Sequence, residues 1–325
     1  MTAVAVAMMT ELIQAAIPIP RMNTNSKATS MMAIMTAPGT VSILTPMMTK
    51  FSFRPMTEFH ENNVVSMSGG KDSTAMLELM KEHGEPIHSV VYCDMGPWEF
   101  PAMHDHIKAV EQSTGIPIVR VKPRWDPVYQ LIEKPVIKRG SKEIYRRGNN
   151  WPSFMRRWCT NQKVNALRRY LKSIPGAVSC IGFAADETKR LKTSAAKSRK
   201  ITCRYPLIEY GMTEAQALQY CYDKGYTWDG LYQIFDRVSC FCCPLQRLGE
   251  LRKLRRLFPD LWSRMLDWDS QVDTSWGVGF RGYQTVHDLE RKFHEADRQM
   301  DLFPGFAEQF VYKKRVKEEQ LELFV

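Results

Sequence analysis

The 325-residue sequence lacks any run of 18 or more apolar residues, which excludes a transmembrane helix. It also contains no internal repeat. The first twenty residues are apolar, but no basic segment precedes them, and Glu11 and Gln14 interrupt them, which argues against a secretory signal. We therefore expect a cytoplasmic protein with no membrane partner.

Cysteine is scarce, with eight residues that are partly clustered. This usage favours a reduced cytosolic chain with a metal or cluster site over a disulfide scaffold. Acidic residues are outnumbered, since 35 Asp and Glu stand against 45 Lys and Arg and leave a formal net charge of +10. The positive balance favours an anionic partner, either a nucleotide or a nucleic acid. A content of 44% hydrophobic and 25% charged residues is typical of a globular protein.

Charge is almost absent from the first 50 positions, which hold only four charged residues but nine of the 19 methionines. Neither helical nor alternating periodicity persists there, and four prolines would break a helix. We predict a disordered leader over residues 1–55, with Met56 as the start of the native protein. The alternative is an N-terminal arm that packs on the domain.

Regular patterning begins at Asn63, where short apolar runs alternate with helical segments. This alternation predicts an α/β fold with a doubly wound, mainly parallel sheet and a C-terminal helical extension. The expected strands are 64–67, 87–93, 117–121 and 177–181. The expected helices are 74–83, 101–113, 160–174, 214–223, 249–257, 260–269 and 284–297. We place an α/β domain at 56–210 and a mostly helical part at 211–325.

The segment Ser68-Gly69-Gly70-Lys71-Asp72-Ser73 lies between a predicted strand and a predicted helix. Two glycines allow a tight turn that presents N–H groups to an anion, and the helix adds its positive N-terminal end. Lys71 supplies a full charge, while Ser68, Ser73 and Thr74 supply hydroxyl donors. The segment is not the P-loop of kinases and GTPases, which places Ser or Thr directly after the lysine. We predict a phosphate-binding loop; the alternative is an ordinary Gly-Gly turn with a solvated lysine.

This loop resembles the signature of the PP-loop, or adenine nucleotide α-hydrolase-like, superfamily. Further motifs resemble the phosphoadenosine phosphosulfate (PAPS) reductase family within it, and they follow one another in that family's order. They are 90–96 with 98–100, 157–160 with Lys163, 181–190, 204–207, 231–232 and the Cys-x-x-Cys-Pro motif at 240–244. The resemblance runs from about residue 62 to about residue 268. It implies a PP-loop nucleotide-binding domain at 56–210.

The resemblance implies that the chain binds an adenine nucleotide, ATP or PAPS, together with Mg²⁺. The residues implied to bind the nucleotide are Ser68, Gly69, Gly70, Lys71, Asp72, Ser73, Thr74, Asp94 and Gly182. Those implied in catalysis are Lys71, Asp72, Ser73, Cys159 and Arg190. Lys71, the loop N–H groups and Arg190 would stabilise charge in the transition state, and Asp94 would position the metal or the ribose.

The chain differs from the family pattern in two places. It has Gly182-Phe183-Ala184 where the family has Gly-x-Arg, so one arginine directed at phosphate or sulfate is absent. It has no cysteine after Cys243, whereas the thioredoxin-dependent reductases use a nucleophilic thiolate on a C-terminal tail. These differences favour a reaction that uses an external thiol or sulfur donor over one in which a cysteine on the chain's own C-terminal tail attacks sulfur.

Cys240 and Cys243 have the spacing with which two thiolates meet one metal or cluster. Cys159, at a predicted helix start, is the preferred third ligand. Cys242 is preferred as the fourth, with Cys203 or Cys180 as alternatives. The resemblance implies a [4Fe–4S] cluster, and zinc is the alternative because both accept cysteine. A further alternative is that these cysteines are buried without a ligand.

Basic residues are concentrated at 138–172, which holds eleven Lys or Arg and one acidic residue, with Tyr145, Trp151, Phe154 and Trp158 among them. A second basic stretch covers 189–204. Basic residues among aromatics suit the backbone and bases of DNA or tRNA. The alternative is that some of them line the nucleotide site and the others form solvated surface.

The function we expect is that of an ATP pyrophosphatase, or adenylylating enzyme, coupled to sulfur transfer. Attack at the α-phosphorus would release pyrophosphate, and sulfur would then displace AMP. One alternative is a sulfonucleotide reductase that uses an external thiol. The other is a nucleotide-gated nucleic-acid-binding protein that acts in DNA or tRNA sulfur modification.

Overall fold

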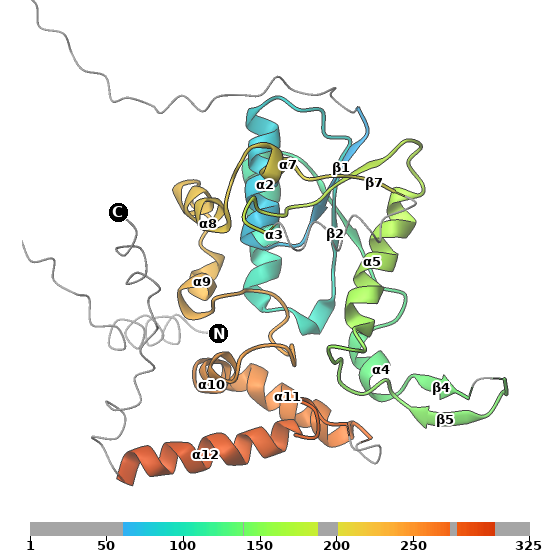
Figure 1. Ribbon diagram of the computed structural model, residues 1–325, viewed down its shortest axis with the longest axis vertical. Helices are drawn as coiled ribbons and strands as arrows, with labels where there is room; N and C mark the ends of the chain where they lie inside the picture. The colour runs from blue at the N-terminus through green and yellow to red at the C-terminus, as the bar shows by residue number, and fades with distance from the viewer. Residues whose placement is uncertain (1–60, 139, 188–200, 274–277, 303–325) are drawn as a thin grey trace, which may run out of the picture. The chain divides into compact units, whose positions relative to one another are not determined.

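A computed structural model of the protein describes residues 61–138, 140–187, 201–273 and 278–302 (Figure 1). The predicted leader at 1–55 and the predicted site residue Arg190 lie outside these ranges. Within them, no helix has both the length and the apolar content needed to cross a membrane.

The central element is a five-stranded parallel sheet with the strand order β3-β2-β1-β6-β7. Its strands are β1 (Asn63–Met67), β2 (Ser89–Cys93), β3 (Ile118–Val121), β6 (Val178–Cys180) and β7 (Thr202–Arg204). Met67 pairs with Tyr92, so the chain leaves β1 and β2 at the same edge of the sheet. The strand order reverses between β1 and β6, the kind of switch point at which α/β sheets bind ligands. The predicted doubly wound parallel sheet is confirmed.

Helices cover both faces of this sheet because successive side chains of a strand point to opposite faces. They are α2 (Lys71–Glu82) and α3 (Pro101–Thr114) on one face and α5 (Trp158–Leu171) on the other (Figure 1). Val65 and Val90 belong to the core under α2 and α3. Val64 and Val91, one residue out of phase, pack instead with Leu171 of α5.

Short elements connect these layers, and longer helices follow them. The short ones are η1 (Gly96–Trp98), α4 (Pro127–Ile132), the antiparallel hairpin β4 (Pro135–Ile137) with β5 (Ile144–Arg147), α7 (Pro206–Glu209), η2 (Trp228–Gly230) and α9 (Leu231–Ile234). The longer ones are α8 (Glu214–Asp223), α10 (Leu248–Leu257), α11 (Pro259–Gln271) and α12 (Val286–Leu302). The predicted helical C-terminal extension is therefore confirmed.

The predicted helix at 74–83 begins three residues earlier, because α2 starts at Lys71. Asp72 and Ser73 thus belong to the first helical turn rather than to a loop. The hairpin β4–β5 and the strand β7 were not predicted. Each of these strands has only three or four residues, too few for an alternating pattern to be recognised.

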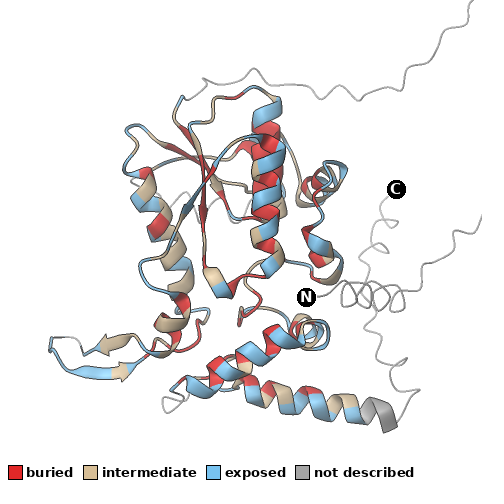
Figure 2. Cartoon of the chain, turned by 180° about the vertical axis from the view of Figure 1, so that it is seen from behind, coloured by how far each residue is buried: buried red, intermediate tan, exposed pale blue. Residues whose placement is uncertain are grey.

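An aromatic core joins the sheet to the C-terminal helices. The ring of Phe100 packs against those of Phe235, Phe241 and Phe258, at centroid distances of 5.4, 5.9 and 5.6 Å. Figure 2 shows buried residues along most of α2, which lies between the sheet and α8. The predicted division at residue 210 stays a prediction.

A buried ion pair attaches β7 to the segment that precedes β2. The carboxylate of Glu85 is fully buried and accepts hydrogen bonds from the guanidinium of Arg204 and from the hydroxyl of Tyr210. Arg204 also contacts Glu209, with its Nε 2.9 Å from Oε2. A buried charge that loses its partner is costly, so this network constrains how the outer strand docks.

We predict that Glu85→Ala lowers the free energy of unfolding by about 3 kcal/mol, the lower end for breaking a buried pair, because Arg204 keeps Glu209. Urea unfolding of the full chain measures this loss. The control is Asp105→Ala, which removes an exposed partner of Lys108 and should cost at most about 0.5 kcal/mol. Equal losses in the two variants would contradict the prediction.

Candidate functional site

The phosphate loop, residues 68–73, connects β1 to the first turn of α2. Gly69 has φ +77°, and a Cβ there would lie 2.9 Å from the Cε of Met103 in α3. The backbone conformation therefore favours glycine, and a larger side chain would also require the end of Met103 to shift. The carbonyl of Gly69 accepts a hydrogen bond of 2.7 Å from the indole Nε1 of Trp228. The turn is thus fixed by α3 and by the C-terminal part of the chain.

Hydroxyl groups close the loop internally. Ser73 donates from Oγ to the carbonyl of Gly70 at 3.0 Å and accepts the N–H of Ser68 at 3.1 Å. The N–H of Lys71 donates to the hydroxyl of Tyr232 at 2.9 Å. No side chain caps the helix, and no hydrogen bond among the described residues uses the N–H of Asp72 or Ser73. Such unpaired donors at a helix start favour an anion.

The loop after β6 lies against this turn. A Cβ on Gly182 would be 2.9 Å from the carbonyl carbon and oxygen of Asp72 and 3.0 Å from the backbone nitrogen of Ser73. These are backbone atoms that cannot move aside, so only glycine fits. The structure therefore brings the predicted residue Gly182 to the phosphate loop.

Carboxylates surround the lysine of the loop. The ammonium of Lys71 lies 2.8 Å from Asp72 and 3.6 Å from Glu214, and its side chain is 12% exposed. Burial raises the pKa of Asp72, an effect that its hydrogen bond from Lys71 opposes. A phosphate bound at the loop would compete with these carboxylates for the lysine.

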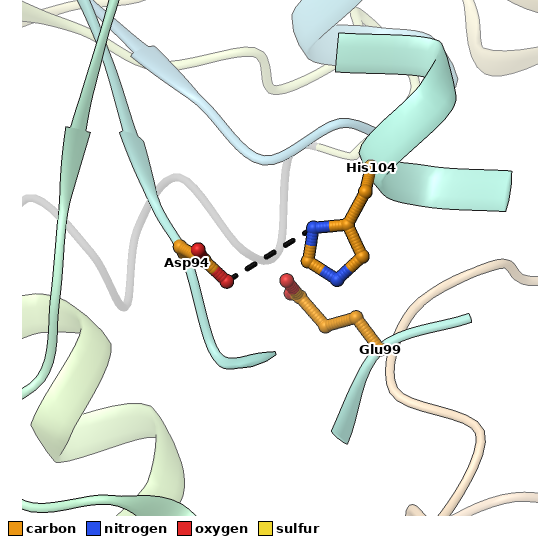
Figure 3. A group of neighbouring side chains, drawn as sticks. All are labelled: Asp94, Glu99 and His104. Atoms are coloured by element: carbon orange, nitrogen blue, oxygen red, sulfur yellow. Dashed lines mark ion pairs between the residues drawn. The ribbon is translucent and has the colours of Figure 1, made fainter. Parts of the chain in front are cut away.

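Asp94, Glu99 and His104 lie beside the same edge of the sheet and turn toward one another (Figure 3). Their ligand atoms all lie within 4.8 Å of one another, and the His104 Nδ1 is 4.0 Å from an Asp94 oxygen. Glu99 already accepts from Lys163 at 2.7 Å and from the hydroxyl of Tyr92. Glu99 thus already has an internal cation as partner.

A divalent cation fits this group only in part. Mg²⁺ prefers oxygen ligands and usually binds one or two carboxylates together with substrate phosphates. Asp94 meets that requirement, whereas the imidazole of His104 suits a transition metal. Within this group, Asp94 is therefore the carboxylate best suited to a nucleotide-bound Mg²⁺.

Three cysteines line a second site, a cavity of about 530 Å³ that we call the thiol cavity. Cys159 comes from the first turn of α5, and Cys240 and Cys243 from the loop before α10. Lys163 lines the same cavity. Cys242 is fully buried and its thiol points toward the carbonyl of Trp98, 3.9 Å away. Its predicted role as a ligand stays a prediction.

Burial favours the protonated form of two of these thiols, those of Cys159 and Cys240. It raises the pKa of Cys240 to about 12, although Lys163 opposes this effect, and it also raises the pKa of Cys159. Sulfurs on one zinc ion, with Zn–S bonds of about 2.3 Å, lie about 3.8 Å apart. The described cysteines form no group of three within 4.8 Å. As they stand, the three sulfurs are therefore not gathered closely enough for one zinc ion to bind them all.

The structure brings most of the predicted residues into two places. Ser68, Gly69, Gly70, Lys71, Asp72, Ser73, Thr74 and Gly182 meet at the phosphate loop, and Cys159, Cys240 and Cys243 meet at the thiol cavity. Sequence reasoning assigned no role to the side chains of Tyr232 and Trp228, which contact the loop, or of His106, which contacts Thr74 just after it. No spacing pattern connects these residues to the loop, and only the tertiary fold shows the contacts.

A family model for the phosphoadenosine phosphosulfate reductase domain matches residues 62–246, more than half of the chain. The chain belongs to this family. The family resemblance predicted from the motifs is therefore confirmed, and with it the chain is a nucleotide-binding PP-loop family member.

Two uncharacterized proteins of Methanocaldococcus jannaschii are similar to this member of the PAPS reductase family. One is 27% identical over 246 residues, which are 70% of this chain and 43% of the relative. The other is 24% identical over 238 residues, 71% of this chain and 53% of the relative. The match therefore spans about half the length of each. A crystal structure of PAPS reductase from Candida auris in a phosphate complex has 15% identity and a TM-score of 0.37, over 55% of this chain and 81% of that one.

His106 makes the loop region sensitive to acid. Its Nε2 lies 2.9 Å from the Oγ1 of Thr74, its ring stacks on Trp228, and burial lowers its pKa to about 3. Below the usual pKa of histidine, about 6.5, His106 is therefore protonated in the unfolded chain but stays neutral in the folded chain. The folded state loses stability as the pH falls from there.

We predict that wild type loses about 1 kcal/mol more unfolding free energy than His106→Gln when the pH falls from about 6.5 to about 5.5. Glutamine keeps a donor for Thr74 and removes the titrating group. Urea unfolding at both pH values measures the difference. The exposed His88→Gln should behave as wild type, and identical pH dependence in all three proteins would contradict the prediction.

Proposed function

We propose that the protein is an enzyme that binds ATP at the phosphate loop and transfers its adenylyl group, coupled to sulfur transfer. The observation that carries the proposal is the first turn of α2. There the N–H groups of Asp72 and Ser73 have no partner among the described residues, and Lys71 lies beside them. Aligned donors, a helix N-terminus and one cation match the oxygens of a phosphate chain.

In the first step an oxygen of the acceptor attacks the α-phosphorus of ATP. The bond from that phosphorus to the bridging oxygen breaks, and pyrophosphate leaves with the electron pair. The acceptor becomes adenylylated. Lys71 and the N–H groups of the loop would stabilise the charge that develops on the phosphate oxygens. A bound Mg²⁺ would offset further charge, with Asp72 and Asp94 available to hold it.

In the second step the terminal sulfur of a persulfide attacks the activated carbon of the acceptor. A carbon–sulfur bond forms, the carbon–oxygen bond breaks, and AMP leaves with the electron pair. An external thiol then cleaves the remaining S–S bond, forming a disulfide with the donor and leaving the sulfur on the acceptor. Cys159, Cys240 and Cys243 would hold the sulfur donor or a cluster close to the start of α5. A bound iron–sulfur cluster would keep these three sulfurs as thiolates.

The second candidate is a sulfonucleotide reductase, which the matched family description favours. An external thiolate would attack the sulfate sulfur of PAPS, and the nucleotide would leave. A second thiol would then form a disulfide with the first and release sulfite. Sulfite release from PAPS without pyrophosphate release from ATP would select this reaction.

We predict that Lys71→Ala lowers pyrophosphate release from ATP and Mg²⁺ by about 100- to 1000-fold, the usual effect of removing one such donor. The matched control is Lys81→Ala, an exposed lysine in the last turn of the same helix, which should keep wild-type turnover. Full turnover in Lys71→Ala would refute the role of the loop. If wild type releases no pyrophosphate from ATP but releases sulfite from PAPS, the protein is a sulfonucleotide reductase rather than an adenylyl transferase.

We also predict that protein purified anaerobically contains iron and sulfide, and that Cys240→Ser and Cys243→Ser lose both. Elemental analysis and the visible absorption spectrum measure this. Cys203→Ser, on β7 and outside the thiol cavity, is the control that should keep the metal. Zinc without sulfide would select the alternative metal. Wild-type protein without metal would end the proposal of a cluster.

A further inference from the structure

The helix α5 carries a polar face that the phosphate loop does not use. Its members recur at helical spacing, three or four residues apart, so they lie along one side of the helix. They are Trp158, Asn161, Asn165, Arg168, Arg169 and Lys172. From Trp158 to Lys172 this face is about 21 Å long at 1.5 Å per residue.

This face forms one wall of a second cavity, of about 560 Å³, which we call the cation pocket. Arg124 and Trp125 line it from the segment after β3, and Lys134 from the segment after α4. Together with Arg168, Arg169 and Lys172 they bring five cations around one hollow. No Asp or Glu lines it.

The five cations of the pocket have no acidic partner within the described ranges. Elsewhere such pairs form readily, as between Arg120 and Glu111 at 2.8 Å. Arg169 donates to the carbonyl of Lys122 at 3.1 Å, which orients its guanidinium without neutralising it. A concentration of uncompensated positive charge in a hollow attracts an anion.

Trp125 gives the pocket an aromatic surface. It is 37% exposed, and Arg124 and Lys134 lie over its ring at 5.4 and 5.5 Å from the centroid. Both cations make cation–π contacts with the indole, and a flat ring that carries phosphate can replace one of them on the ring face while its phosphate pairs with the displaced charge. The amides of Asn161 and Asn165 face the same hollow and form no hydrogen bond with other described residues. They can pair with the edge of a base.

We propose that the cation pocket binds a single-stranded nucleic acid, with a base stacked on Trp125 and the phosphates along α5. A base enters such a hollow only when it is unpaired, which disfavours a duplex. Five cations spread over three segments exceed what one nucleotide engages, which disfavours a free mononucleotide. A single strand and a free nucleotide both present a nucleobase with phosphate, and the experiment below distinguishes between them.

The cation pocket adjoins the thiol cavity through α5. Trp158 lines the first and Cys159 the second, and the ring of Trp158 lies 5.1 Å from that of Trp98, which lines the thiol cavity. A strand on α5 would thus pass close to the cysteines. The inference rests on the proposed function only if the bound nucleic acid is also the acceptor of the adenylyl group. Binding itself is measured without turnover, so the two proposals fail separately.

The experiment is fluorescence anisotropy of the full chain with a labelled single-stranded oligonucleotide of about 16 residues, as DNA and as RNA. We expect binding that weakens about 20-fold between about 50 and about 150 mM salt, as four phosphate contacts require. The same oligonucleotide in a duplex should bind more weakly. AMP and ATP are the competitors that test for a mononucleotide site.

The variant Arg168→Gln with Lys172→Gln should flatten the salt dependence and weaken binding. Trp125→Ala should weaken it about 5- to 150-fold, the effect of losing one stacked base, and Trp125→Phe should restore most of the loss. The matched control, Arg264→Gln with Lys292→Gln, removes two exposed cations from α11 and α12 and should bind as wild type. None of these residues lies in the phosphate loop, so all these variants should still bind ATP as wild type does.

Three results would overturn the inference. The first is no binding at low salt. The second is an equal loss of binding in the control variant, which would show attraction to net charge alone. The third is that AMP or ATP displaces the oligonucleotide from wild type but not from Trp125→Ala. This result would assign the pocket to a free nucleotide. Preferential binding of the duplex would equally contradict a single-stranded ligand.

Discussion

The phosphate loop is held in shape from outside, and the rest of the site depends on that support. The helix α2 has no side-chain cap, so its first turn leaves donors that a protein normally satisfies itself. Trp228 and Tyr232, about 160 residues further along the chain, bind the backbone on either side of Gly70. Their contacts fix the turn, while no described residue takes the N–H groups of Asp72 and Ser73. The C-terminal part is therefore a structural component of the phosphate loop.

The second organising element is α5, which serves two cavities at once. Its position against β2 and β3 is set by the core that Leu171 shares with Val64 and Val91. With that side buried, the helix turns Cys159 toward the thiol cavity and its arginines toward the cation pocket. A helix packed on a sheet is rigid, so the spacing between the cavities is fixed. Chemistry that needs a sulfur and a polyanionic substrate at a set distance suits such an arrangement.

The sequence predicted most of the fold because its strands and helices have strong local signals. The parallel sheet follows from buried apolar runs that alternate with helices, and the loop from two glycines between a strand and a helix. What could not be predicted rests on tertiary contact. The hairpin β4–β5 is short and exposed, and the contact of His106 with Thr74 joins residues 32 positions apart. The basic residues at 138–172 were visible as composition, but Arg124, Trp125 and Lys134 joined them only through the fold.

The charges at Lys71 limit how a nucleotide can bind. In the structure its ammonium has two carboxylate partners, Asp72 and Glu214. A triphosphate that replaces them leaves Asp72 partly buried beside several phosphate oxygens, and like charges in a medium of low dielectric repel strongly. Burial already raises the pKa of Asp72, so the carboxyl is prepared for neutralisation. Binding must therefore supply Asp72 with a proton or with a divalent cation shared with the phosphates. Under the proposed function the cation is the better solution, because it also offsets the charge that leaves with pyrophosphate.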